Sequence, residues 1–320
     1  MMDLYNMEYM YFALNESRGV IDNYYDIGEE IYNKLNDVTP QLIDSETGLY
    51  LRALKDVKID FECFIERISV MYYTYISGKS DSKGRFIPYE SNNENLTKSK
   101  KLINSKIVLY ERTDTPEKMD KYHFMDAFSH EIAHAYRYYS ILCQNNSNIP
   151  DSIKKENNIY TSISNIKNFF NEKARMFING IIYLIDKDET AAFSNETYEQ
   201  LRQNEHINRG NIHEHFNDFR MYRNITLLKT FLSNFDKSIN NEKSLNEIRT
   251  ILNELYGTDY TSNKGIKLFR QKIVREIIKM SNQFIKVIEK GLIDFNRCNM
   301  FYKEHFSERE LNLILENFNI

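Results

Sequence analysis

The residues best suited to chemistry form one short motif, His130-Glu131-Ile132-Ala133-His134, which has the pattern H-E-x-x-H. On a helix, residues i and i+4 lie on one face, one turn apart, so two imidazoles at this spacing can chelate one metal ion. Glu131 is turned about 100 degrees round the helix from His130, and its carboxylate can reach a metal-bound water instead of the metal. Zinc lowers the pKa of such a water. The motif therefore predicts a Zn²⁺ site in which His130 and His134 bind the metal and Glu131 is the general base.

The sequence around this motif resembles the zincins, the zinc metallopeptidases that carry H-E-x-x-H on a helix. A strand-like segment at 107–109 precedes the motif, and in zincins the upstream strand is usually the sheet edge along which a peptide substrate lies. The metzincin branch requires a histidine six residues after the second motif histidine and a glycine three residues after it. Here Ser140 and Arg137 occupy those positions, which excludes that branch.

The resemblance to the gluzincin branch implies Glu189 as the third metal ligand. Glu189 begins an E-x-x-A pattern, and Ala192, one turn further on, leaves room for the motif helix. Some gluzincins have an aspartate four residues after this glutamate, where it orients a zinc histidine. This chain has Phe193 there, and Glu196 is the candidate for that supporting role.

Several other residues are candidates for the remaining roles. The alternative third ligands are Glu172, His206 and the pair His213 and His215. An H-x-H pair on a helix points to opposite sides, so both histidines can join one site only where the backbone is extended. His123, two turns before His130, is expected at a pocket edge or in the core. The candidates for stabilising a developing oxyanion are Tyr198, His206, His213 and Tyr222.

The elements that must position these residues follow from hydrophobic periodicity and turn signals. We expect a helix at 17–37, strands within 56–75, an edge strand at 85–89, a strand at 106–111 and the motif helix at 118–142. Thr115 and Pro116 have the residue types of a helix start. The remaining sequence is mostly helical in pattern from Ile159 onward, with breaks near Asp186, 209–211, 238–244 and 257–265.

These elements predict an α+β fold that is mostly helical, with a small mixed sheet beside the motif helix and a helical C-terminal part. The domain organisation expected from the motifs is a zincin-like metallopeptidase domain at 1–205 and a helical region at 206–320 packed on it. With 42% hydrophobic residues, the 320-residue chain has enough apolar material for a substantial core.

Composition limits the classes of partner. The net charge is -4, from 42 basic and 46 acidic residues, so no nucleic-acid partner is expected. The three cysteines have neither zinc-ribbon spacing nor an obvious disulfide pattern, which favours a reducing compartment. We expect no signal peptide and no membrane-spanning segment, and hence a cytoplasmic protein, or a virion-associated one if a bacteriophage encodes it.

The leading functional hypothesis is a zinc endopeptidase that acts on an extended peptide or protein substrate. The alternative is a structural or virion-associated protein on a zincin scaffold with weak or no activity, and a zinc-dependent toxin or effector is a third hypothesis. The organisation also resembles uncharacterised metallopeptidase-like proteins of bacteriophages that infect gut bacteria. The intact Glu131 favours the enzyme, because a scaffold has no need of a base. Nothing in the sequence specifies an oligomeric state.

Overall fold

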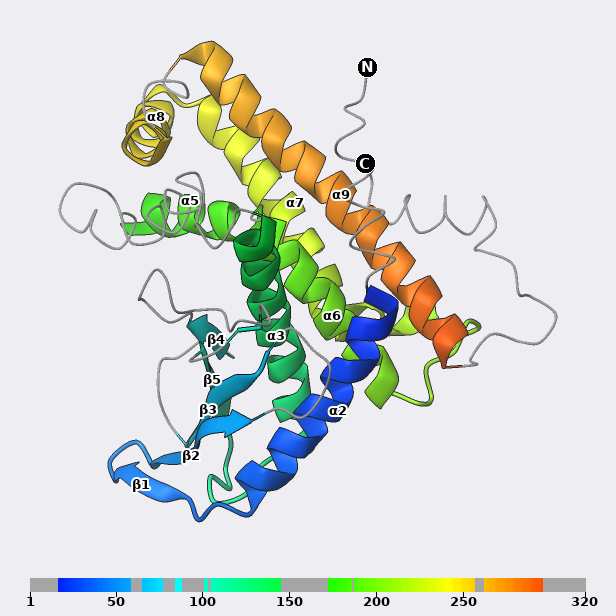
Figure 1. The fold of residues 1–320 in the computed structure, drawn as a ribbon. Helices are drawn as coiled ribbons and strands as arrows, with labels where there is room; N and C mark the ends of the chain where they lie inside the picture. Colours follow the sequence, from blue (N-terminus) through cyan, green and yellow to red (C-terminus); the bar gives the residue numbers. More distant parts are fainter. Residues whose placement is uncertain are drawn as a thin grey trace. The chain divides into compact units, whose positions relative to one another are not determined.

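The computed structural model in Figure 1 describes residues 17–58, 65–76, 84–87, 101–102, 105–144, 172–185, 187–256 and 262–295. The chain packs as two compact units, Met1–Ile149 and Pro150–Ile320. The fold is α+β, mostly helical with a small mixed sheet, as predicted. The domain boundary predicted at 205 is chosen so that all the expected metal ligands fall in one domain, and not from packing. It stays a prediction.

The first unit contains a five-stranded sheet with the strand order β1-β2-β3-β5-β4. Its strands are β1 (Gln41–Asp44), β2 (Leu49–Lys58), β3 (Arg67–Tyr75), β4 (Gly84–Ile87) and β5 (Ser105–Arg112). The central pair β3 and β5 is parallel, and the other pairs are antiparallel. The sheet is therefore mixed, with β1 and β4 as its edge strands.

The predicted strands are confirmed where the sequence signal was hydrophobic. In β3, buried Ile68, Val70 and Tyr72 alternate with more exposed residues, and β5 buries a continuous apolar run. The predicted edge strand exists as β4. The prediction missed β1 and β2, because β1 is largely exposed and β2 buries little besides Arg52. The predicted alternation at Ile59, Phe61 and Cys63 lies outside the described residues.

Two helices, α2 (Ser17–Asn36) and α3 (Lys121–Gln144), lie side by side in the first unit (Figure 1). On α3, buried Phe124 contacts Tyr32 of α2 and Tyr72 of β3, with ring centroids 5.6 Å apart in both pairs, and it stacks on Phe128. Aromatic pairs of this kind add to the free energy gained by burial. The motif helix is thereby fixed to both α2 and the sheet.

The start of α3 differs from the prediction. The helix begins at Lys121, and Asp120 caps it, because its Oδ1 accepts a hydrogen bond from the His123 amide at 2.8 Å. The carbonyls that an earlier start would use are already occupied. Pro116 O accepts from the Thr74 hydroxyl at 2.7 Å, and Glu117 O accepts from the Arg52 guanidinium. These bonds to the sheet hold residues 115–118 as a turn.

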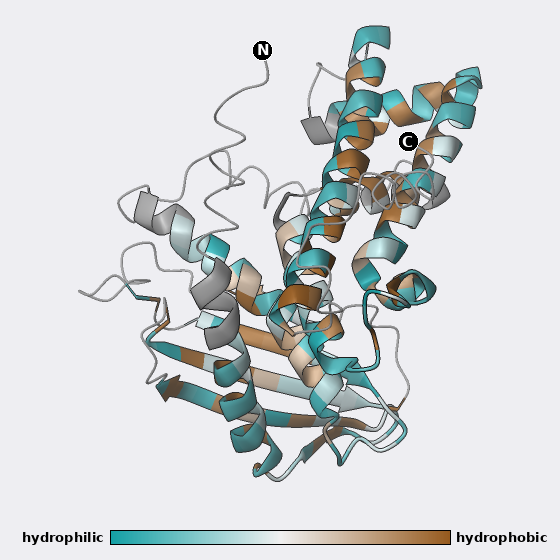
Figure 2. Ribbon diagram, turned by 90° about the vertical axis from the view of Figure 1, so that its right-hand side faces the viewer, coloured by the Kyte–Doolittle hydropathy of each residue, from teal (hydrophilic) through white to brown (hydrophobic). Residues whose placement is uncertain are grey.

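The second unit is built from helices. They are α5 (Glu172–Leu184), α6 (Lys187–Gln203), the 3-10 helix η1 (Ile212–Asp218), α7 (Arg220–Ile239), α8 (Glu242–Tyr256) and α9 (Asn263–Asp294). The predicted breaks at 209–211 and 238–244 fall between these helices, whereas Asp186 and residues 257–261 lie outside the described residues. The 32-residue α9 packs along α6 and α7, and Phe269 and Phe284 of α9 belong to the apolar core. Figure 2 shows hydrophobic and hydrophilic residues interleaved along the helices, as expected of amphipathic elements. Among the described residues, no helix has the length and apolar character to cross a membrane.

Two polar side chains, those of Tyr72 and Glu111, are buried together in the sheet next to the start of α3. The Tyr72 hydroxyl donates a hydrogen bond to Glu111, and both residues are buried. Burial raises the pKa of the Glu111 carboxyl above its ordinary value, while the hydrogen bond from Tyr72 and nearby His123 act in the opposite direction. Burial also raises the pKa of Tyr72, which therefore stays a donor.

We expect Tyr72→Phe to destabilise the protein more at neutral pH than in acid. A raised folded-state pKa means that the contribution of Glu111 to stability is fully present below the unfolded carboxyl pKa and is lost as pH rises through the folded pKa. Removing the Tyr72 hydroxyl raises the folded-state pKa of Glu111 further, so more stability is lost as the pH rises. The expected cost is about 1.5–3 kcal/mol where Glu111 is ionised and about 0.5–1.5 kcal/mol where it is neutral.

Urea unfolding at about pH 8 and about pH 4, either side of the affected titration, measures the difference. Tyr73→Phe on the same strand is the control, because the Tyr73 ring stacks on Tyr110 and does not contact the carboxylate group described above. An equal loss for Tyr72→Phe at both pH values would contradict the expectation.

Candidate functional site

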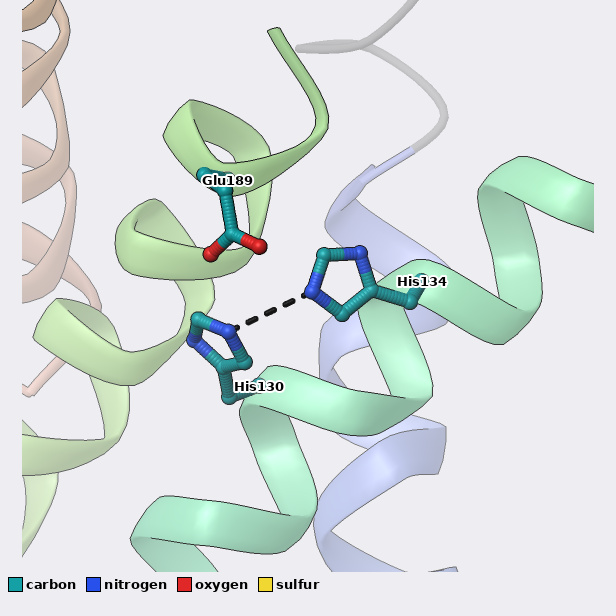
Figure 3. Close-up of side chains that lie close together, drawn as sticks. All are labelled: His130, His134 and Glu189. Carbon is teal, nitrogen blue, oxygen red and sulfur yellow. Dashed lines mark hydrogen bonds between the residues drawn. The ribbon is translucent and has the colours of Figure 1, made fainter. Parts of the chain in front are cut away.

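Helix α3 brings the two motif histidines together. Nε2 of His130 and Nε2 of His134 lie 3.3 Å apart, within hydrogen-bonding distance, as Figure 3 shows. The ring centroids are 5.0 Å apart and the ring planes cross at 73°. His130 is buried and His134 is half-buried. The i, i+4 spacing of the motif therefore produces a facing pair of imidazoles, as predicted.

The separation of the two nitrogens suits a tetrahedral metal ion. Zinc–nitrogen bonds of about 2.0–2.1 Å at the tetrahedral angle place two nitrogen ligands about 3.3 Å apart. The Nε2–Nε2 distance of 3.3 Å matches this value. The distance is therefore compatible with two nitrogen ligands of one tetrahedral metal ion.

Glu189 supplies a carboxylate to the same set of ligand atoms. One ligand atom each from His130, His134 and Glu189 lies within 4.8 Å of the others (Figure 3). Two imidazoles and one carboxylate are the protein ligands of several catalytic zinc sites. The three residues predicted as metal ligands thus form a group that could hold a metal ion.

One hydrogen-bond partner of Glu189 is a residue that the sequence did not indicate. Tyr183 of α5 makes a side-chain hydrogen bond with Glu189, and burial together with the charge of Glu189 raises the Tyr183 pKa. Its hydroxyl therefore stays protonated and donates to the carboxylate. Such a bond restricts the orientation of a carboxylate ligand.

Glu131, the predicted base, is only 4% exposed, and β4 approaches it closely. A Cβ atom added at Gly84 would lie 2.7 Å from Oε1 and 2.7 Å from Cγ of Glu131. A side chain at position 84 would therefore occupy the space that the Glu131 side chain uses. In the sequence, Gly84 ends a stretch rich in turn-forming residues at 78–84, and that pattern gives no indication of this contact between residues far apart in the chain.

The other predicted candidates lie in different surroundings. Glu196 is buried and pairs with Arg220 at 3.1 Å, so its supporting role toward a metal histidine stays a prediction. The Tyr198 hydroxyl donates to Asp294 at 2.9 Å, and Tyr222 packs on Phe216 and Phe284. The side chain of Glu172 lies outside the described residues.

The remaining histidines of the described residues do not belong to the three-residue group. His206, His213 and His215 lie between α6 and α7, on the segment that includes η1. His123 is half-buried, and its Nε2 lies 3.3 Å from the backbone oxygen of Tyr110. This is the position expected of a histidine at the edge of the core.

Comparison with known protein families, with curated proteins and with solved structures gives no match to this chain.

We expect the H-E-x-x-H motif of the purified protein to bind about one equivalent of zinc, because its two imidazoles have the spacing of tetrahedral ligands. His134→Ala should bind almost none at the motif, and Glu189→Ala should bind zinc more weakly. Metal analysis after purification without chelators and reconstitution with Zn²⁺ measures this. His123→Ala is the matched control, because His123 lies on the same helix face and is expected to leave the zinc content unchanged.

Gly84→Ala is expected to displace the Glu131 carboxylate while the strand keeps its place. Among the described glycines only Gly48 has a positive φ, so alanine at 84 meets no backbone strain, and the atoms it would contact belong to a flexible side chain. The free energy of unfolding should change by no more than about 1 kcal/mol.

A crystal structure and urea unfolding of the variant test both parts of this expectation. Arg85→Ala on the same strand serves as the control. An unmoved carboxylate, or a loss of stability of several kcal/mol, would show that β4 does not constrain Glu131 in this way.

Proposed function

We propose that this protein is a zinc-dependent metallopeptidase that hydrolyses peptide bonds. The observation that carries the proposal is the facing pair of imidazoles on α3, whose Nε2 atoms lie 3.3 Å apart with Glu131 in the intervening turn. A chance pair of surface histidines would not need a buried glutamate beside it. The pattern H-E-x-x-H and the E-x-x-A pattern at Glu189 add the resemblance to gluzincins.

The metal site would consist of His130, His134 and Glu189. Zinc at this position would supply a Lewis acid that acidifies water and polarises a carbonyl group. Tyr183 would hold the Glu189 carboxylate in place through its hydrogen bond. The two histidines would bind the metal through a ring nitrogen each, which requires those nitrogens to be unprotonated.

Glu131 would act as the general base. It lies on α3 next to His130, but it is absent from the group of three candidate ligands. As the base, its carboxylate would accept a proton from the attacking water and pass it to the leaving amine. Its near-complete burial excludes bulk solvent from the side chain, and Gly84 leaves the space in which the carboxylate sits.

The sheet offers a place for an extended substrate. Among the described strands, β4 pairs with β5 alone, so one of its edges is not covered by another described strand. A peptide can add to such an edge through backbone hydrogen bonds. Because β4 also approaches Glu131, a peptide on this edge would pass close to the proposed base. We therefore propose an extended peptide or protein as the substrate.

Glu131→Gln tests the mechanism. The amide cannot accept the proton of water at neutral pH, and general-base catalysis typically contributes about a hundredfold to ten-thousandfold. Cleavage of a broad peptide library should fall by at least about a hundredfold, while zinc content and the free energy of unfolding stay close to those of the unchanged protein. Glu30→Gln, on the surface of α2, is the control for an unrelated loss of charge.

Two results would contradict the proposal. If Glu131→Gln cleaves peptides as fast as the unchanged protein, Glu131 is not the base. If the zinc-loaded protein cleaves no peptide of the library, the alternative of a structural protein on a zincin scaffold is favoured over the enzyme.

A further inference from the structure

A second pair of histidine rings meets in the segment that joins α6 to α7. The ring centroids of His206 and His215 lie 4.9 Å apart, and the ring planes cross at 73°. The motif pair on α3 has a similar centroid distance, 5.0 Å, and the same interplanar angle, 73°. The two histidines are nine positions apart in sequence, so this pairing comes from the folding of the segment and not from helical spacing.

The backbone on both sides of this pair is firmly held. Ile207, Ile212 and Phe216 are buried in the apolar core of the second unit, and two of them directly follow the two histidines in sequence. The His206 carbonyl accepts hydrogen bonds from the side chains of Asn211 and Asn208, at 3.0 and 3.3 Å. The backbone that carries the two rings is therefore held in place, which lowers the entropic cost of bringing both rings to one ligand.

The Asp218 carboxylate fixes the tautomer of the neutral His215 ring. Nδ1 of His215 lies 2.9 Å from Oδ2 of Asp218. Because an ionised carboxylate only accepts hydrogen bonds, Nδ1 carries the proton and Nε2 of the neutral ring keeps its lone pair. A carboxylate on the far nitrogen is the usual partner of a metal-binding histidine.

We propose that His206 and His215 form a second binding site, for a divalent transition-metal ion, with Asp218 orienting His215. Two imidazoles suit Cu²⁺, Ni²⁺ and Zn²⁺, with Cu²⁺ bound most tightly. His206 is exposed and His215 is half-buried, so a metal ion reaches the pair from solvent and water completes its coordination. A metal ion bound there would connect the end of the α6 segment to η1. This inference does not depend on the proposed peptidase activity.

Titration of the full chain with Cu²⁺, followed by calorimetry and by the nitrogen splitting in the electron paramagnetic resonance spectrum, tests the site. We expect two binding events. His134→Ala removes the one at the H-E-x-x-H motif, and His206→Ala and His215→Ala each remove the other, which His134→Ala leaves in place. Asp218→Asn should weaken this event about tenfold to a hundredfold. His213→Ala is the matched control, because His213 is exposed on the same segment and its ring packs on Phe216 instead of on the pair. This control should change the affinity by less than about twofold.

Two outcomes would overturn the inference. The first is Cu²⁺ binding that neither His206→Ala nor His215→Ala weakens. The second is an equal loss of binding in His213→Ala. Circular dichroism of each variant identifies a change in folding, and the exposed His206→Ala remains informative if His215→Ala alters η1. Because the event removed by His134→Ala is separate, failure of this site leaves the proposed zinc site untouched, and the reverse also holds.

Discussion

The chemistry proposed for this protein depends on the packing of α3 between α2 and the sheet. Phe124 contacts rings from both neighbours and stacks on Phe128, which lies two positions before His130. This apolar side of the helix fixes its rotation. The motif side is fixed in consequence, because all side chains of one helix turn together. A metal site needs its ligands placed to within a fraction of an ångström, and rigid packing of one helix supplies that for two of them.

Burying the polar side chains of this helix costs free energy unless they have hydrogen-bond partners. His130 and Glu131 are both nearly inaccessible to solvent. The two motif imidazoles lie within hydrogen-bonding distance of each other. A metal ion in the same position would bind to both ring nitrogens. Because such a site exists only when α3 is folded and packed, metal binding would add to the free energy of folding.

The sequence was sufficient to predict those features that depend on neighbours within one element. The histidine pair follows from i, i+4 spacing, and β3 and β5 follow from apolar patterning. The edge position of β4 follows from Pro88 in the sequence, because proline cannot donate a hydrogen bond within a central strand. Strand β2 could not be predicted this way, because pairing with β3 holds it in place more than burial of its side chains does.

Features that depend on distant residues were beyond local patterns. Helix α3 is capped by Asp120 and not by Thr115, because side chains of the sheet donate hydrogen bonds to the carbonyls of Pro116 and Glu117. The contact of Gly84 with Glu131 and the hydrogen bond of Tyr183 with Glu189 join separate elements. Glu189 itself was found through its resemblance to a family pattern, since a single glutamate near the start of a helix carries little information.

The order of the strands has a consequence for assembly. Strand β4 precedes β5 in the chain, yet it lies outside β5 and pairs with no other described strand. Because it is held in the sheet through β5, it can detach while the other four strands stay paired. Local opening of this kind costs less free energy than global unfolding. The edge beside Glu131 could then open without unfolding of the rest of the sheet, so hydrogen exchange in β4 should be faster than in the central strands β3 and β5.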